Sequence, residues 1–281
     1  KAEVLYVQNK DNSIFRLKYR YKIGTLNDSK QALATQYIQF LGTDKMSAEQ
    51  ISKAFYKIAC SFNISSGEEY TTVSIEGLQE NFEKAVQLYE EVISNAKADE
   101  NALKALKARI AKSRKDVKAN KNAILQGLTS YATYGPVNKF NSILTTAELE
   151  SLTTEDLMSR LKNMNNYEQT IIYYGPAPLT TFVNQLKALH KVPATFTATP
   201  AAKVFKPLVQ TQNQVFFTNY DMVQAETRWV RNTETYDANK NAIINVFNNY
   251  FGGGMGSVVF QTIRESKALA YSTYGYYVEP Q

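Results

Sequence analysis

The side chains that most often perform acid, base or nucleophilic chemistry are scarce in this sequence. Its 281 residues contain one histidine, His190, and one cysteine, Cys60. With no second histidine and no thiol pair, we expect that no zinc site, Ser-His-Asp triad or Cys-His pair can be assembled from this chain. Carboxylates are plentiful, which leaves paired-acid chemistry open, but no motif singles out a pair of them.

The surroundings of these two residues indicate structural roles. His190 ends a predicted helix beside Lys187 and Lys191, so we expect it at the surface. Cys60 lies among apolar neighbours, Phe55, Ile58 and Phe62, and we expect a small buried apolar residue. A lone cysteine excludes an intrachain disulfide and leaves the compartment open.

Further polar groups of interest lie in segment 250–271. A predicted helix over 237–251 ends in three consecutive glycines, Gly252, Gly253 and Gly254, which allow positive φ and close backbone approach. A short helix then carries Arg264, and Tyr271 opens a predicted aromatic strand over 271–277. No Gly-Lys-Ser/Thr follows the glycines, which excludes a phosphate-binding loop. By themselves these residues indicate a helix cap, a surface ion pair and a strand tyrosine.

The whole segment resembles one known sequence pattern. Its Gly-Gly-Gly-Met, Phe-x-x-Ile-Arg-Glu and Leu-Ala-Tyr elements are similar to a stretch of the pitrilysin/insulinase-like zinc metallopeptidases, an inverzincin clan that includes processing-peptidase relatives. In that family the Arg and Tyr lie in a domain without metal and hold the substrate backbone next to the zinc. Arg264 and Tyr271 match them, so the resemblance implies that both bind substrate. A guanidinium and a hydroxyl are suitable donors to peptide carbonyls and to a developing oxyanion.

The same family carries its zinc on H-x-x-E-H, in a helix just before a Gly-Thr pair. Gly42-Thr43 matches that pair, and counting back places the motif at Leu33, Gln36 and Tyr37. None of these can replace two imidazoles and a catalytic glutamate. The third ligand, a glutamate in the family, would fall within 110–113, where there is no carboxylate. The resemblance therefore implies a degenerate metal motif, no metal in this segment, and zinc in a separate catalytic half.

The elements that would position these residues follow two periodicities. Residues 14–23 alternate strictly, which predicts a strand with one buried and one wet face. Its buried side chains would be Phe15, Leu17, Tyr19, Tyr21 and Ile23, and its exposed ones Arg16, Lys18, Arg20 and Lys22. Further strands are predicted at 3–8, 62–65, 70–75 and 168–174, and helices at 30–41, 47–59, 80–96, 103–131 and 179–190, with another starting at 154.

This mixture indicates an α+β fold, in which an antiparallel-rich sheet has helices packed on one face. The order of elements at 14–65 recurs at 224–277, which suggests repeated domains. It resembles the metallopeptidase-half architecture, LuxS/processing-peptidase-like. The predicted domains are a degenerate peptidase-like domain over 1–192, a Pro-, Thr- and Ala-rich linker over 193–208, and a truncated second homologous domain over 209–281, with strands at 214–219 and 224–231. Because this copy stops early and the chain begins at Lys1, we expect a fragment of a longer precursor.

Composition and charge narrow the class of partner. A hydrophobic fraction of 44% with a net charge of +6 is typical of a globular protein. The lysine-rich run 104–121 predicts a solvated helix face, with a patch for acidic partners as the second reading. No aromatic residues interleave with the run, which argues against a nucleic-acid surface. No apolar run is long enough for a transmembrane segment.

The resemblance thus favours the non-catalytic, C-terminal half of a pitrilysin-type zinc metalloendopeptidase, inactive by itself. Its partners would be an H-x-x-E-H catalytic half, in the same longer chain or another subunit, and an unfolded peptide substrate. The alternative is a structural or peptide-holding subunit with no catalytic partner. An H-x-x-E-H half encoded upstream or in an adjacent gene would separate the two. Family habit favours a periplasmic or otherwise exported location.

Overall fold

The computed structural model describes residues 2–278, which form two compact units. The first unit runs to Leu208 and also includes Asn213–Arg228. The second consists of Val209–Gln212 and the chain from Trp229 onward. Each unit is described separately below, and the assignment of 209–281 to a second homologous domain stays a prediction.

The first unit is built on a five-stranded sheet with the order β1-β5-β2-β4-β3. Its strands are β1 (Glu3–Gln8), β2 (Ile14–Tyr21), β3 (Cys60–Ser66), β4 (Thr71–Leu78) and β5 (Gln169–Gly175). Only β1 and β5 run parallel among these pairs, while β2–β4, β2–β5 and β3–β4 are antiparallel. The α+β fold is therefore confirmed, as are the strands predicted at 3–8, 14–23, 62–65, 70–75 and 168–174.

Strand β2 lies at the centre and shows the predicted alternation. Phe15, Leu17, Tyr19 and Tyr21 have no exposed surface, while the side chains between them are exposed. Aromatic rings from the helices cover the buried face, with Phe82 at 5.0 Å from Phe15 and Tyr89 at 5.5 Å from Tyr19 between ring centroids. This register is fixed because a one-residue slip would bring the charged side chains of β2 into the core.

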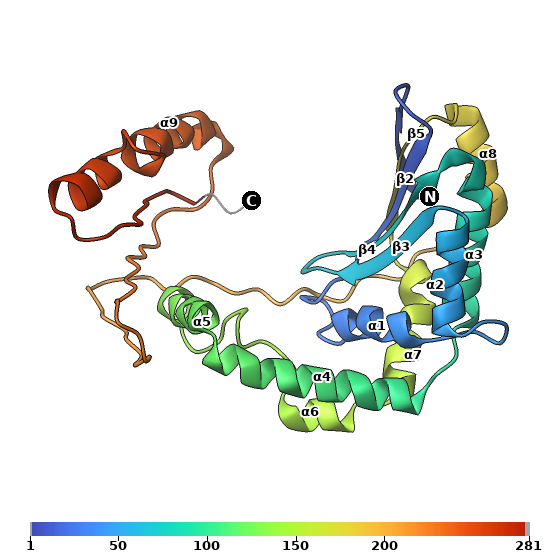
Figure 1. Ribbon diagram of the computed structural model, residues 1–281, viewed down its shortest axis with the longest axis horizontal. Coiled ribbons are helices and arrows are strands. Elements are labelled where there is room, and N and C mark those ends of the chain that lie inside the picture. The colour runs from blue at the N-terminus through green and yellow to red at the C-terminus, as the bar shows by residue number, and fades with distance from the viewer. Residues whose placement is uncertain (1, 279–281) are drawn as a thin grey trace. The chain divides into compact units, whose positions relative to one another are not determined.

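Helices pack on one face of the sheet, as Figure 1 shows for α2, α3 and α8. The helices of this unit are α1 (Gln31–Tyr37), α2 (Ala48–Lys57), α3 (Phe82–Asn95), α4 (Glu100–Ala119), α5 (Lys121–Tyr134), α6 (Thr146–Ser151), α7 (Thr154–Asn163) and α8 (Leu179–Leu189), with 3₁₀ turns η1 (Ile38–Phe40), η2 (Gln79–Asn81) and η3 (Met164–Asn166). Helix α2 begins with the predicted capping box, in which Ser47 and Gln50 exchange hydrogen bonds with each other's backbone.

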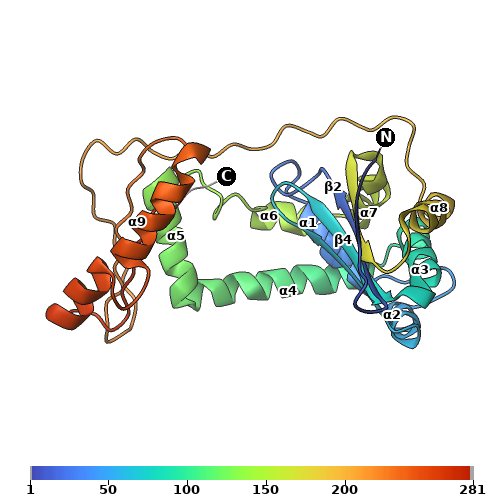
Figure 2. The same ribbon diagram turned by 90° about the horizontal axis from the view of Figure 1, so that it is seen from above.

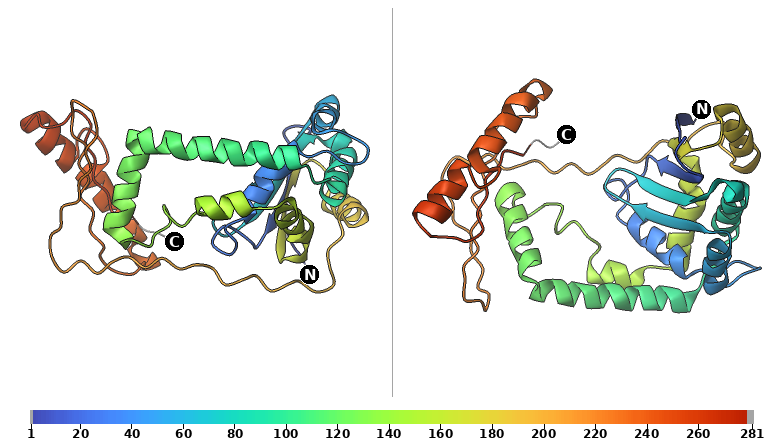
Figure 3. Two further views of the ribbon diagram at one scale, coloured as in Figure 1. Left: turned by 90° about the horizontal axis from the view of Figure 1, so that it is seen from below. Right: turned by 45° about the horizontal axis from the view of Figure 1, so that its top comes forward.

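Helices α4 and α5 meet at a corner at Asn120 (Figures 2 and 3). Asp99 starts α4 by accepting hydrogen bonds from the backbone N–H groups of Asn101 and Ala102, at 2.8 and 2.9 Å. Among the residues of α4, only Leu103 and Leu106 are buried, so the rest of the helix extends beyond the core. Its basic side chains consequently lie near solvent, as predicted for the run 104–121.

The prediction that His190 lies at the surface is wrong. Its imidazole has no exposed surface and lies between Glu90, 2.7 Å from Nδ1, and Gln169, 3.0 Å from Nε2. The ring also stacks on Tyr19 at 4.4 Å. The lysines close to His190 in sequence suggested an exposed side chain, but the residues that contact the imidazole come from α3 and from the sheet. His190 therefore fastens the end of α8 to the core. Cys60, in contrast, is buried as predicted.

The predicted linker over 193–208 is irregular and lies along the first unit. The Thr199 hydroxyl donates to the Lys22 carbonyl at 2.7 Å, and the Asn27 amide donates to the Pro200 carbonyl at 2.8 Å. The Lys203 backbone N–H donates to the Leu26 carbonyl at 2.9 Å. These bonds hold the segment against the turn that precedes α1.

The second unit contains the 3₁₀ turn η4 (Ala238–Lys240), α9 (Asn241–Gly252) and the π-helix η5 (Phe260–Ser266). The strand predicted at 271–277 is wrong, because the structure gives this segment no strand pairing. The strands predicted at 214–219 and 224–231 are wrong too, because these segments, which lie mostly in the first unit, do not join its sheet. A strand needs a neighbour for its backbone N–H and C=O groups, and the described part of this unit has no sheet. The predicted helix over 237–251 is confirmed, although none of the residues of α9 is buried.

Candidate functional site

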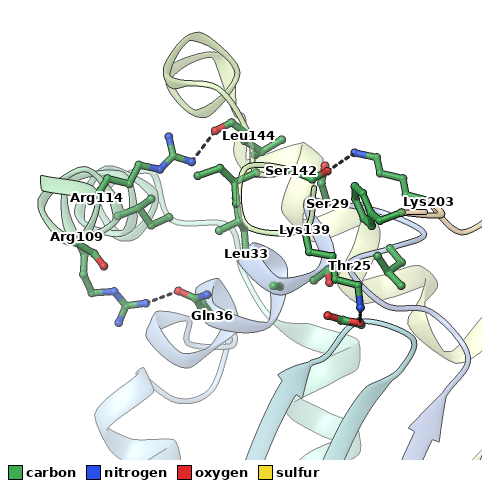
Figure 4. Close-up of a pocket in the computed structure, with 17 residues that line it drawn as sticks. Thr25, Ser29, Leu33, Gln36, Arg109, Arg114, Lys139, Ser142, Leu144 and Lys203 are labelled. Carbon is green, nitrogen blue, oxygen red and sulfur yellow. Dashed lines mark hydrogen bonds and ion pairs between the residues drawn. The ribbon is translucent and has the colours of Figure 1, made fainter. Parts of the chain in front are cut away.

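A cavity of about 520 Å³ lies beside α1 in the first unit (Figure 4). Helix α1 contributes Leu33 and Gln36 to its wall, and α4 contributes Ile110 and Ser113. The resemblance places one lost metal ligand at Leu33, the lost catalytic glutamate at Gln36 and the lost third ligand within 110–113. The cavity thus joins the two parts of the chain, about seventy residues apart, that the resemblance linked.

Tyr37, the third position of the degenerate motif, points elsewhere. Its side chain has no exposed surface, and its hydroxyl donates to the Asp99 carbonyl at 2.8 Å while accepting from the Asp99 N–H at 2.7 Å. Burial raises the pKa of Tyr37, so the phenol stays neutral. Tyr37 therefore positions the residue that caps α4.

The residues of this cavity do not fit zinc. Leu33 has no lone pair, and the Gln36 side-chain oxygen accepts a hydrogen bond from the Arg109 guanidinium at 3.0 Å. A fixed positive charge thus lies where a cation would bind. Throughout residues 2–278, no three His, Cys, Asp or Glu side chains lie close enough together to hold a metal ion.

Basic side chains surround the cavity instead. Arg114 donates to the Leu144 carbonyl at 2.7 Å, and Lys139 pairs with Glu68 at 2.6 Å. Lys203 donates to the Ser142 hydroxyl at 3.4 Å. The basic run 104–121 gave a sequence signal for Arg114, whereas nothing in the sequence indicated that Lys139 and Lys203 would join it.

In the second unit, the glycine run lets two backbones approach closely. A Cβ atom added to Gly252 would overlap the Gly275 carbonyl oxygen, so no other residue fits this contact. Gly254 has φ of +141°, a conformation that residues with a side chain rarely adopt. Asn248 of α9 adds two hydrogen bonds to the Tyr277 backbone, at 2.6 and 3.0 Å. Segment 271–277 therefore runs beside α9 without strand pairing.

Arg264 and Tyr271 lie together in this unit. The Arg264 guanidinium carbon is 4.4 Å from the centroid of the Tyr271 ring and 4.7 Å from that of Phe260. Arg264 lies in the π-helix η5, a form that recurs at functional sites, and Ala268 has φ of 48° in the turn that follows. Tyr271 is 83% exposed, and Arg264 also approaches Glu265 at 3.5 Å. Both side chains thus present donors to solvent from one surface.

Comparison with known proteins places these features in a family. The family model described as insulinase (peptidase family M16) matches residues 23–171, more than half of the chain. This chain belongs to peptidase family M16. The model described as the peptidase M16 inactive domain matches residues 151–280, which include the glycine run, Arg264 and Tyr271. The resemblance to pitrilysin/insulinase-like zinc metallopeptidases is therefore confirmed.

Individual relatives agree with the family. The uncharacterized zinc protease YmxG of Bacillus subtilis is 27% identical over 248 residues, which cover 86% of this chain and 58% of YmxG. This M16 chain thus spans less than two thirds of that relative. A peptidase M16 inactive domain from Pseudomonas fluorescens has a similar fold, with a TM-score of 0.70 at 16% identity, over 99% of this chain and 69% of that one.

The periplasmic protease PqqL of Escherichia coli also shares the fold. Its TM-score is 0.62 at 14% identity, over 74% of this M16 chain and 24% of PqqL. Within the described part of the chain, no helix combines the length and apolar character that a membrane crossing requires.

Proposed function

We propose that this M16 chain is the non-catalytic, substrate-binding half of a zinc metalloendopeptidase. The observation that carries the proposal is the pairing of Arg264 with Tyr271, at 4.4 Å between guanidinium carbon and ring centroid. Both lie within the match to the M16 inactive domain. The zinc protease name of YmxG supports a metallopeptidase as the whole assembly.

In this proposal, Arg264 and Tyr271 hold the backbone of an unfolded peptide. A guanidinium offers several N–H donors in a fixed plane, and the tyrosine hydroxyl offers one more. Because the guanidinium lies over the ring, the two groups restrict each other's orientation before the peptide arrives. Donors held in advance stabilise negative charge on a peptide carbonyl without reorganising during the reaction.

Zinc would belong to the H-x-x-E-H half, which this half would face to close the peptide chamber. The test is reconstitution, in which this chain and an H-x-x-E-H half are purified separately and assayed on an unfolded casein-like peptide. Each part alone should leave the peptide intact, and the mixture or the joined chain should cleave it in a chelator-sensitive way. Chelator-sensitive cleavage by this chain alone would contradict the proposal.

The alternative, a peptide-holding subunit without a catalytic partner, gives a different outcome. It is favoured by the cavity beside α1, where Arg109 donates a hydrogen bond to Gln36 of the degenerate metal motif. In that case no H-x-x-E-H half would be encoded upstream or in an adjacent gene, and no reconstituted mixture would cleave peptide. A periplasmic or otherwise exported location completes the proposal, supported by the periplasmic protease PqqL, and fractionation of the native cells tests it.

A further inference from the structure

The cavity beside α1 carries an unbalanced positive charge. Four basic side chains line it, Arg109, Arg114, Lys139 and Lys203. Among its described lining residues, Glu68 is the one carboxylate, and it pairs with Lys139 at 2.6 Å. Three positive charges therefore remain without a negative partner in the cavity wall.

Within the cavity wall, each of these three cations donates a hydrogen bond to a neutral oxygen, while outside the wall Arg109 lies over the Phe40 ring at 5.1 Å and Lys203 attracts the Glu148 carboxylate. Arg109 donates to the Gln36 amide, Arg114 to the Leu144 carbonyl, and Lys203 to the Ser142 hydroxyl. Figure 4 shows these contacts, which hold the side chains around the opening. A neutral acceptor fixes the direction of a cation but leaves its charge uncompensated, so an added anion gains charge-assisted hydrogen bonds.

The remaining walls suit the side chains of a peptide. Apolar surface comes from Ala32, Leu33, Ile110, Ile143 and Phe205. Hydroxyl donors come from Thr25, Ser29, Ser113 and Ser142. A volume of about 520 Å³ is within the usual range for ligand sites. Methylene groups of acidic side chains can contact the apolar surface while their carboxylates reach the cations.

The cavity lies where the family's zinc site would be, but its lining is basic where a zinc site would be acidic. The family's motif would place an imidazole at Leu33, a glutamate at Gln36 and a further carboxylate within 110–113, whereas here Arg109 donates a hydrogen bond to Gln36. The positions remain at one cavity, but the chemistry now attracts anions. We propose that this cavity binds the acidic side chains of a peptide, with Arg109, Arg114 and Lys203 as the carboxylate ligands. That the ligand is a peptide rests on the proposed function, whereas the preference for negative charge follows from the cavity.

A binding measurement tests the inference without any catalytic partner. Fluorescence anisotropy of the purified chain would compare a labelled peptide with a cluster of Asp and Glu against a peptide of equal length with Asn and Gln in their place. The acidic peptide should bind at least tenfold more tightly, and raising the salt concentration should weaken it. Equal affinity for the two peptides would overturn the inference.

Matched variants on one helix locate the site. Arg109→Gln with Arg114→Gln should weaken the acidic peptide at least tenfold, because both side chains line the cavity. Lys115→Gln with Lys118→Gln removes the same charge from exposed residues of α4 outside the cavity and should change affinity less than twofold. If the glutamine pair disturbs folding, Arg109→Lys with Arg114→Lys provides a second test that keeps both positive charges. This lysine pair should still bind the acidic peptide more tightly than the neutral one. If both glutamine pairs lost the same affinity for the acidic peptide, the attraction would come from the overall charge of α4, and the proposed site would be overturned.

Inorganic phosphate separates a peptide site from a simple anion site. Millimolar phosphate should displace the acidic peptide only weakly, because phosphate lacks contact with the apolar walls. Phosphate that binds as tightly as the peptide would overturn peptide recognition. The two proposals can fail separately. If reconstitution fails but the chain still prefers the acidic peptide, only the peptidase role is removed. If the reconstituted protein cleaves peptide but the chain shows no preference for the acidic one, only this inference is removed.

Discussion

The guanidinium of Arg264 lies over the ring of Tyr271, with its central carbon 4.4 Å from the ring centroid. The two residues are seven positions apart in sequence, and the turn at Ala268 lies between them. The contact survives replacement of the hydroxyl, because a phenylalanine ring also attracts a cation. The roles of ring and hydroxyl can therefore be measured separately.

The first prediction concerns these two residues, with the catalytic half present. Arg264→Ala should lower turnover about a hundredfold, roughly 3 kcal/mol, with little change in thermal midpoint, since it removes a charged donor to substrate. Tyr271→Phe should lower turnover by a similar or smaller factor. Tyr274→Phe, another exposed tyrosine of the same segment, is the matched control and should keep full activity. Wild-type rates in both test variants would end the claim that they touch substrate.

A second prediction distinguishes two glycines that are close in sequence. Gly252→Ala should destabilise the second unit by about 2 kcal/mol or more, because its methyl group would overlap the Gly275 backbone. Gly256→Ala has open space around the new methyl group and should change stability by less than about 0.5 kcal/mol. Urea denaturation of the two variants makes the comparison. Equal stabilities would show that segment 271–277 does not lie against α9.

Metal content gives a third prediction. The purified chain should hold no stoichiometric zinc after dialysis, because Leu33 and Gln36 supply no zinc ligand and Arg109 lies beside Gln36. Gln36→Glu should still hold none, since its carboxylate would pair with Arg109 instead. Elemental analysis of both proteins makes the measurement, and one tightly bound zinc per wild-type chain would contradict the degenerate reading.

Tyr37 provides a fourth prediction, on stability alone. Tyr37→Phe removes two hydrogen bonds to Asp99 in a buried site and should cost about 1–3 kcal/mol of unfolding free energy. Tyr56→Phe is the control, because Tyr56 is 84% exposed and should change stability by less than about 0.5 kcal/mol. Chemical denaturation compares them. A Tyr37→Phe protein as stable as wild type would mean that these hydrogen bonds do not hold the start of α4.

The fifth prediction is a pH dependence from the ion pair between Lys30 and Asp156, 2.8 Å apart. The hydrogen bond from Lys30 lowers the pKa of Asp156 from 3.8 to about 2, although burial opposes the shift. A depressed carboxyl pKa stabilises the fold above about pH 4, and this contribution is lost as the pH falls toward 2. After solvent screening of a part-exposed pair, we expect roughly 1 kcal/mol.

Thermal midpoints measured from pH 5 to pH 2 should therefore fall less steeply in Asp156→Asn than in wild type. Lys30→Met and the double variant complete a cycle that separates the ion pair from the capping contact of Asp156 with Thr153. Parallel curves for wild type and Asp156→Asn would show that the pair does not contribute in this range.

Much of the first unit follows from local sequence. The alternation in residues 14–23 placed Phe15, Leu17, Tyr19 and Tyr21 in the core, because the two-residue period of a strand determines which side chains share a face. The capping box of α2 was readable for the same reason, since all its partners lie within three residues. The family resemblance likewise depended on a contiguous pattern, around Arg264 and Tyr271.

Contacts between distant parts of the chain were decided by tertiary structure. His190 looked exposed beside two lysines, yet Glu90 and Gln169 enclose it, and neither residue is close to it in sequence. Lys139 and Lys203 joined Arg109 and Arg114 only because the loop and the segment after α8 return to α1. Segment 271–277 has the composition of a strand, but pairing needs a neighbouring strand, and its backbone bonds to Asn248 instead. Local periodicity determines which side chains share a face of a helix or strand. The contacts that this face makes are determined by the folding of distant segments against it.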